Sequence, residues 1–129
     1  MSDLTKELTA ALGQRILVLD GAMGTTIREY KLTEAEARGT RFAKNEKDLL
    51  NNGDILSITR PDVIGDIHKR FLLAGSDIIE TNTFSGTTLA QSEFFVEDPR
   101  EKGLGRKDPA FFQDKVVDNA FLKELAWEI

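Results

Sequence analysis

The sequence predicts an α/β protein with a parallel sheet, because two apolar runs each stop abruptly at polar residues. Ile16–Leu19 is closed by Asp20 and Gly21, and Asp77–Thr81 carries adjacent β-branched residues before its own polar end. Unbroken apolar runs of this length are typical of strands covered on both faces. A helical pattern over 59–75 lies between them, and strand, helix, strand is the order of a right-handed parallel crossover. Ligands bind at the carboxyl ends of such strands, so we expect a site there.

Composition narrows the possible functions. The 129 residues suffice for one domain, and the absence of Cys excludes disulfides and thiolate metal sites within the chain. The net charge of −5, with acidic and basic residues mixed along the sequence, does not predict the basic patch that binds nucleic acid. No run of 18 apolar residues predicts a membrane span, and the polar segment Met1–Thr9 lacks the core of a secretory signal. We therefore expect a cytoplasmic protein that binds neither nucleic acid nor membrane.

The amino-terminal third contains one helix and one glycine-containing loop. Apolar residues at helical spacing predict a helix over Leu4–Leu12, stopped by Gly13 and placed outside the core as a lid or plug. The loop Gly21–Thr26 would let backbone amides approach a ligand closely. It lacks the third glycine of a dinucleotide fingerprint and the Gly-Lys-Ser/Thr of a phosphate loop, so it does not indicate a nucleotide.

The middle of the chain is a charged excursion followed by a strong helix. A short helix ends over Ile27–Tyr30, and Lys31–Gly53 is expected to be ordered by the anchors Leu32, Phe42, Leu49 and Leu50. A turn at 51–54 precedes Ile55–Ile58, an extended piece that either pairs as a strand or crosses the mouth of the site.

The strongest helix begins with Thr59 as cap, Pro61 in the first turn and Asp62 in capping-box position, and Gly75 ends it. Its apolar stripe is Val63, Ile64, Ile67, Phe71 and Ala74. His68 lies beside the stripe, where a boundary residue is the simpler interpretation than a ligand, because no second ligand accompanies it.

The polar residues that follow Ile79 have two interpretations. They form either a ligand site at the end of the strand or a polar turn by which the chain leaves the core. A helix is predicted over Thr87–Phe95, then a charged loop over Glu97–Pro109. Opposite charges offset each other in that loop, which favours a solvated surface over an anion site. A last helix from Asp114 presents the apolar face Val116, Val117, Ala120, Phe121, Leu125 and Trp127.

Two or three strands cannot close a barrel, which needs on the order of 250 residues. A third possibility, a complete small α/β protein of another function, would leave bare sheet edges. We therefore expect the amino-terminal quarter to third of a larger domain.

Three motifs resemble one known family. They are Leu19–Thr25, Thr59–Ile79 with its Ala-Gly-Ser-Asp turn, and Glu80–Phe84. Together they closely resemble the homocysteine S-methyltransferase domain, a zinc-binding (β/α)8 TIM barrel. Tyr30–Glu36 and Arg38–Phe42 look more like its cobalamin-dependent methionine synthase branch than its betaine-using one. The resemblance implies that residues 1–129 are the amino-terminal part of such a barrel, incomplete in this chain.

The resemblance also implies site residues. Asp20 matches the carboxylate that faces the substrate ammonium, Gly21 the close-approach backbone, and Thr81 a pocket hydroxyl. Burying a carboxylate at the end of a strand costs free energy unless a cation pairs with it, and this agrees with binding of the substrate ammonium by Asp20. Glu80 and Asn82 are expected to line or support the pocket. Met23, Thr25 and Phe84 either line the pocket or serve packing.

The three zinc cysteines of the family have no counterpart, because the chain has no Cys. We therefore expect a methionine synthase fragment with no catalytic or metal-binding residue, inactive alone. The full enzyme would use zinc, cobalamin and methyltetrahydrofolate, with further barrel, folate and cobalamin domains as partners, to methylate homocysteine. The alternative is a non-catalytic module that binds a small amino acid or docks onto a separate chain and completes the barrel with it.

Overall fold

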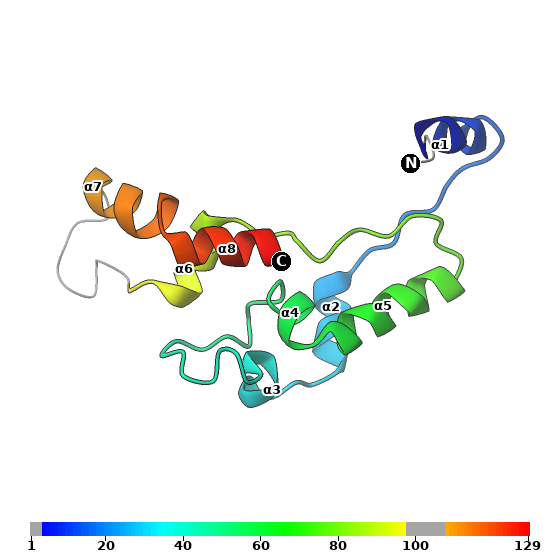
Figure 1. The fold of residues 1–129 in the computed structure, drawn as a ribbon. Helices are drawn as coiled ribbons and strands as arrows, with labels where there is room; N and C mark the ends of the chain where they lie inside the picture. The colour runs from blue at the N-terminus through cyan, green and yellow to red at the C-terminus, as the bar shows by residue number, and fades with distance from the viewer. Residues whose placement is uncertain (1–3, 98–107) are drawn as a thin grey trace.

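The computed structural model describes residues 4–97 and 108–129, and its regular elements are helices joined by long connections (Figure 1). The ribbon is elongated, with α1 apart at one end, α2, α4 and α5 in the middle, and α6, α7 and α8 at the other end. The helices are α1 (Leu4–Leu12), α2 (Met23–Glu29), α3 (Glu34–Arg38), α4 (Leu56–Thr59), α5 (Pro61–Leu73), α6 (Thr88–Phe95), α7 (Pro109–Phe112), the π-helix η2 (Gln113–Val117) and α8 (Ala120–Glu128).

The predicted fold class, the amino-terminal part of a (β/α)8 barrel with a parallel sheet, is wrong. Within the described ranges no sheet forms, and strand pairing is limited to one isolated parallel bridge between Leu19 and Ile78. The backbone bonds around it are Asp77 N to Val18 O at 2.8 Å and Asp20 N to Ile78 O at 2.9 Å. The two predicted strands therefore exist as extended segments that touch at one point.

The apolar runs that predicted buried strands are largely uncovered. Ile16 is 87% exposed, and Val18 and Leu19 are about half exposed (52% and 50%). Two extended segments offer few backbone hydrogen bonds and no second layer, and such a pair is marginal by itself. Apolar β-branched residues favour extended backbone, but burial depends on neighbours that a local pattern does not specify.

The buried core contains two small hydrophobic clusters that meet at α4, and Val63, Ile67, Val116 and Leu122 are buried outside them. One contains Ala37, Leu56 and Ile64 and is flanked by Met23, Ile27 and Leu32. The other contains Phe42, Leu49, Ile55 and Leu125 and is flanked by Ile58, Phe94, Phe95 and Ile129. Ile55 and Leu56 are neighbours in sequence but join different clusters. The prediction of an extended piece over 55–58 is wrong, because Ile55 has helical backbone angles and Leu56–Thr59 forms α4.

The structure confirms the strongest predicted helix and corrects its start. α5 buries Val63, Ile64 and Ile67, and Gly75 follows it with a φ of +107°. Thr59 does not cap it, because Thr59 ends α4 and Arg60 takes the cap position, with its guanidinium bound to Asp62. His68 is half-buried.

The charged excursion is ordered, as predicted. Thr33 and Glu36 form a reciprocal capping box at the start of α3. Phe42 and Leu49 are buried anchors, whereas the predicted anchor Leu50 is 46% exposed. The helices predicted at the amino terminus and over 87–95 are also present, as α1 and α6.

The predicted carboxyl-terminal helix is interrupted. Asn119 accepts a hydrogen bond from the Leu122 amide and starts α8 separately from η2. The new register buries Leu122 and Leu125 and leaves Phe121 and Trp127 exposed, so the predicted apolar face is only partly correct. Most of the predicted loop over 97–109 lies outside the described residues.

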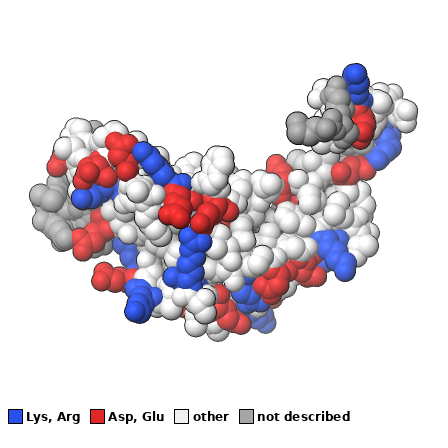
Figure 2. Space-filling view, in the orientation of Figure 1, with Lys and Arg blue, Asp and Glu red and all other residues white. Residues whose placement is uncertain are grey.

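The described surface carries charges of both signs. Acidic and basic side chains are interspersed on the face drawn in Figure 2, and neither sign gathers into one field. Within the described ranges, none of the helices has both the length and the apolar character that crossing a membrane requires.

The contact between the two extended segments should be sensitive to acid. Arg15 donates to both carboxylate oxygens of Asp77, at 2.7 and 2.5 Å, and the Val18 amide donates to Asp77 Oδ2 at 2.9 Å. The Arg15 hydrogen bonds and then the Val18 amide lower the pKa of Asp77 from 3.8 to about 2. A depressed folded pKa means that the stabilisation is complete above the unfolded pKa and is lost as the pH falls through the folded one.

We therefore predict that the segment contact persists at pH 4 and is lost as the pH falls from about 3.8 through about 2. Titration of the Asp77 carboxyl carbon by NMR measures this directly. Arg15→Met should raise the Asp77 pKa toward its ordinary value. An ordinary Asp77 pKa with Arg15 in place would contradict the contact.

Candidate functional site

A hollow of about 240 Å³ lies where the two extended segments end. It is lined by two short stretches, residues 20–24 and residues 80–84. All five residues predicted for the site, Asp20, Gly21, Glu80, Thr81 and Asn82, line it. The chain thus brings together groups that are about sixty positions apart in sequence, and it does so without a sheet.

Asp20 connects the two stretches with its backbone and its side chain. Its amide donates to the Ile78 carbonyl at 2.9 Å, and its Oδ1 accepts from the Glu80 amide at 3.0 Å. Oδ2 has no hydrogen-bond partner among the described residues. One carboxylate oxygen therefore fixes the wall of the hollow, and the other is available to a cationic group.

The loop after Asp20 leaves backbone open to the hollow. A side chain built at Gly21 would meet no atom within 4 Å, so the space beside it is free. Ala22 adopts a left-handed conformation with a φ of +52°, which turns the chain into α2. A compact backbone bend lined by small residues is suited to a ligand that needs amide donors.

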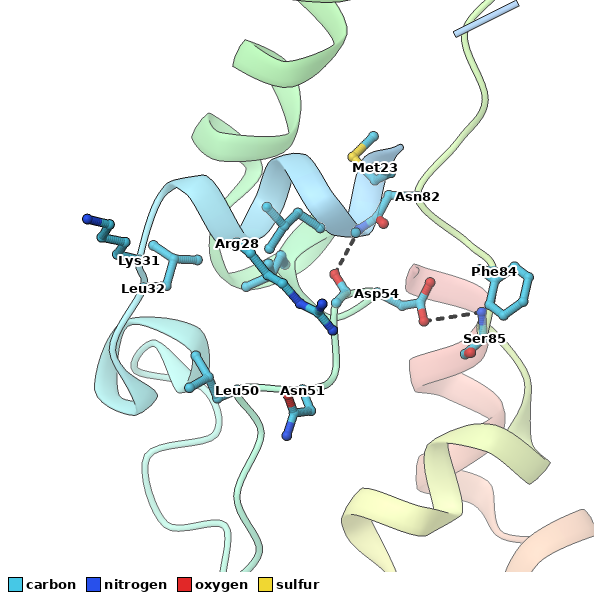
Figure 3. A pocket seen from close by; sticks show the side chains of 14 residues that line it. Met23, Arg28, Lys31, Leu32, Leu50, Asn51, Asp54, Asn82, Phe84 and Ser85 are labelled. Atoms are coloured by element: carbon cyan, nitrogen blue, oxygen red, sulfur yellow. Dashed lines mark hydrogen bonds between the residues drawn. The ribbon is translucent and has the colours of Figure 1, made fainter. Parts of the chain in front are cut away.

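The residues of the second stretch differ in what they contact. The hydroxyls of Thr81 and Thr83 are 2.9 Å apart and share a hydrogen bond, and Glu80 has an exposed side chain. Asn82 Nδ2 donates to the Gly53 carbonyl at 2.8 Å and to Ser57 Oγ at 3.2 Å (Figure 3). The amide donors of Asn82 are thus used to hold the stretch against the start of α4.

A second, larger hollow of about 520 Å³ adjoins the first and shares Met23, Gly24, Asn82 and Phe84 with it. Figure 3 shows its wall between α2 and the segment that carries Asn51 and Asp54. Asp54 is buried, and its Oδ2 accepts from the Ser85 amide at 3.1 Å. Of the residues whose role was open, Met23 and Phe84 line both hollows, while Thr25 lines neither.

A buried amide pair supports this arrangement from behind. Asn52 Nδ2 donates to Gln91 Oε1 at 2.7 Å, Gln91 Nε2 donates to Asn52 Oδ1 at 3.3 Å, and Gln91 Nε2 also donates to the Ser85 carbonyl at 3.0 Å. Sequence reasoning treated Asn52 only as part of a turn and Gln91 as part of a helix. Gln91 is followed by the polar residues Ser92 and Glu93, so the sequence offers no signal that it is buried.

The donor set does not fit a zinc site. The chain has no Cys, and within the described ranges no group of three or more His, Asp or Glu side chains is placed to hold a metal ion. No chemical step can therefore be derived through a metal held by these residues.

The comparison with protein families decides the relationship. The family model described as homocysteine S-methyltransferase matches residues 17–108. The chain belongs to the homocysteine S-methyltransferase family. The matched range contains both stretches of the smaller hollow.

Membership of the homocysteine S-methyltransferase family supports, at the level of the family, methyl transfer to homocysteine as the substrate. The matched range runs from the first extended segment through α6 and includes the three sequence motifs. The helices α7 and α8 lie beyond it, and α8 contacts α6 directly.

The buried amide pair predicts a specific pattern of stability. Gln91→Leu leaves the buried Asn52 amide unpaired, which should lower the free energy of unfolding by about 1–3 kcal/mol. The double variant Asn52→Leu, Gln91→Leu should lose less than the sum of the two single variants, because neither amide is then left unpaired and only the Ser85 carbonyl lacks its donor. Urea denaturation of the two single variants and the double variant measures the coupling, and strictly additive losses would contradict the pair.

Proposed function

We propose that residues 20–24 and 80–84 bind the amino-acid end of homocysteine. The observation that supports this is the Asp20 carboxylate, whose Oδ1 is fixed by the Glu80 amide while Oδ2 remains without a partner in the described part of the chain. A fixed carboxylate facing an open hollow favours a cationic ligand group, and the substrate of the family carries an ammonium.

Each side of the hollow then has a role. The free oxygen of Asp20 accepts from the substrate ammonium, and the backbone at Gly21 provides amide donors for the substrate carboxylate. The Thr81 hydroxyl, paired with Thr83, completes the polar wall. Asn82 and Asp54 do not contact the ligand in this proposal. They hold the 80–85 segment in place by hydrogen bonds, Asn82 to the Gly53 carbonyl and Asp54 to the Ser85 amide.

The reaction that we propose for the parent activity is methyl transfer to the homocysteine sulfur, giving methionine, in the manner of a cobalamin-dependent methionine synthase. Zinc, cobalamin and methyltetrahydrofolate belong to that proposal. The described residues do not fit zinc, so we assign them binding and orientation only.

A second candidate is a non-catalytic homocysteine-binding module. The observation that favours it is the lack of any thiolate donor in a chain of this family. Binding of homocysteine is common to both candidates. Methyl transfer by the protein, measured as methionine formed from homocysteine with methylcobalamin as donor, separates them.

The binding proposal predicts the effect of Asp20→Asn. This change preserves an oxygen that can accept from the Glu80 amide but removes the negative charge. Affinity for L-homocysteine, measured by calorimetry under reducing conditions, should fall about tenfold or more because a charge-assisted hydrogen bond is lost.

The matched control is Asp48→Asn, which removes the same charge from an exposed side chain that lines neither hollow. It should leave homocysteine affinity unchanged. A ligand without the ammonium, 4-mercaptobutanoate, should bind both wild type and Asp20→Asn equally weakly. Equal homocysteine affinity in wild type and Asp20→Asn would overturn the assignment.

A further inference from the structure

Arg28 differs from the other arginines of the described residues. Five of them form ion pairs with carboxylates on the chain: Arg15, Arg38, Arg41, Arg60 and Arg70. The Arg28 side chain has no ion pair and no hydrogen bond within the described ranges, whereas its backbone carbonyl accepts from the Lys31 amide. Arg28 is exposed, and among the described arginines its guanidinium is the one without a carboxylate partner, in an acidic protein with 22 Asp and Glu residues.

Arg28 lines the larger hollow. Figure 3 shows its side chain extending from α2 toward the segment that carries Asn51 and Asp54. Lys31 also lines the hollow, at its edge, with its ammonium directed away in the same view. Asp54 is the acidic residue of the lining, and its Oδ2 accepts from the Ser85 amide. Asp54 forms no ion pair with Arg28, so the N–H donors of the guanidinium remain available to a ligand in the hollow.

The rest of the lining is mainly apolar. Met23, Ile27, Leu32 and Leu56 belong to the hydrophobic cluster beneath the hollow, and Leu50 and the exposed Phe84 stand at its sides. A volume of about 520 Å³ lies within the usual range for small-molecule sites. An apolar wall with one unpaired guanidinium beside it favours an anion that carries an apolar body.

We propose that the larger hollow is a second ligand site, for a carboxylate with an apolar chain or ring, in which Arg28 binds the carboxylate and the α2 and α4 side chains contact the apolar part. Arg is suited to this because its planar fork can donate two parallel hydrogen bonds to a carboxylate. The site is distinct from the Asp20 hollow, which selects a cation, and it does not depend on the proposed function.

Octanoate is a suitable probe. Binding is followed by NMR at the Arg28 Nε–H signal and by calorimetry, with octan-1-ol as the neutral analogue and inorganic phosphate as an anion without an apolar body. Octanoate should saturate and bind about tenfold more tightly than octan-1-ol or phosphate.

The variants separate charge from folding. Arg28→Gln should weaken octanoate binding about tenfold, and Arg28→Lys, which keeps the charge but loses the planar fork, should weaken it less. Lys69→Gln removes a positive charge from the exposed face of α5 and should change binding by less than about twofold. Circular dichroism checks that all variants fold alike. Equal binding of octanoate and octan-1-ol, or equal losses in Arg28→Gln and Lys69→Gln, would overturn the proposal.

Discussion

The pairing of residues 18–20 with residues 77–80 is the contact on which the site depends. Three backbone hydrogen bonds and two carboxylates hold it, Asp77 toward Arg15 and the Val18 amide, and Asp20 toward the Glu80 amide. The carboxylates compensate for what the segments lack, since neither is covered by a second layer. Without this contact the two stretches that line the smaller hollow would have no fixed distance between them.

The remaining support comes from the polar groups around α4 and α6. Asn82 is bonded to Gly53 and Ser57, Ser85 to Asp54, and the Asn52 and Gln91 amides to each other. The bonds of Asn82 and Ser85 tie the 80–85 segment to residues 53–57, and Gln91 also donates to the Ser85 carbonyl. Ile55 and Leu56 anchor residues 53–57 in the two hydrophobic clusters. The site therefore rests on hydrogen bonds between loops, and the clusters beneath stabilise those loops.

The sequence predicted the local elements better than their assembly. Helical spacing and caps located α1, α5 and α6, because these signals act within a few residues. Burial of Ile16–Leu19 was not predictable from the run itself, since it requires neighbours elsewhere in the chain. The break at Asn119 was missed because the apolar spacing continues across it, whereas the capping bond to Leu122 starts a new helix.

The sequence motifs predicted that one site contains Asp20, Gly21, Glu80, Thr81 and Asn82. In the structure all five line the smaller hollow. The motifs did not reveal what each residue contacts. The Asn82 amide group is used in hydrogen bonds to neighbouring residues, and Asp54 and Gln91 bind Ser85. These partners, and the lack of one for the Arg28 side chain, are defined only by the tertiary structure.

Single-residue amide hydrogen exchange tests the pairing most directly. The amides of Asp20, Asp77 and Glu80 donate to acceptors on the opposite segment, so the account predicts that all three exchange slowly and together, and more slowly still with homocysteine bound. The amide of Gly21, for which the structure gives no partner, provides the internal reference. Exchange of Asp20 and Glu80 at the rate of an unstructured chain would contradict the account.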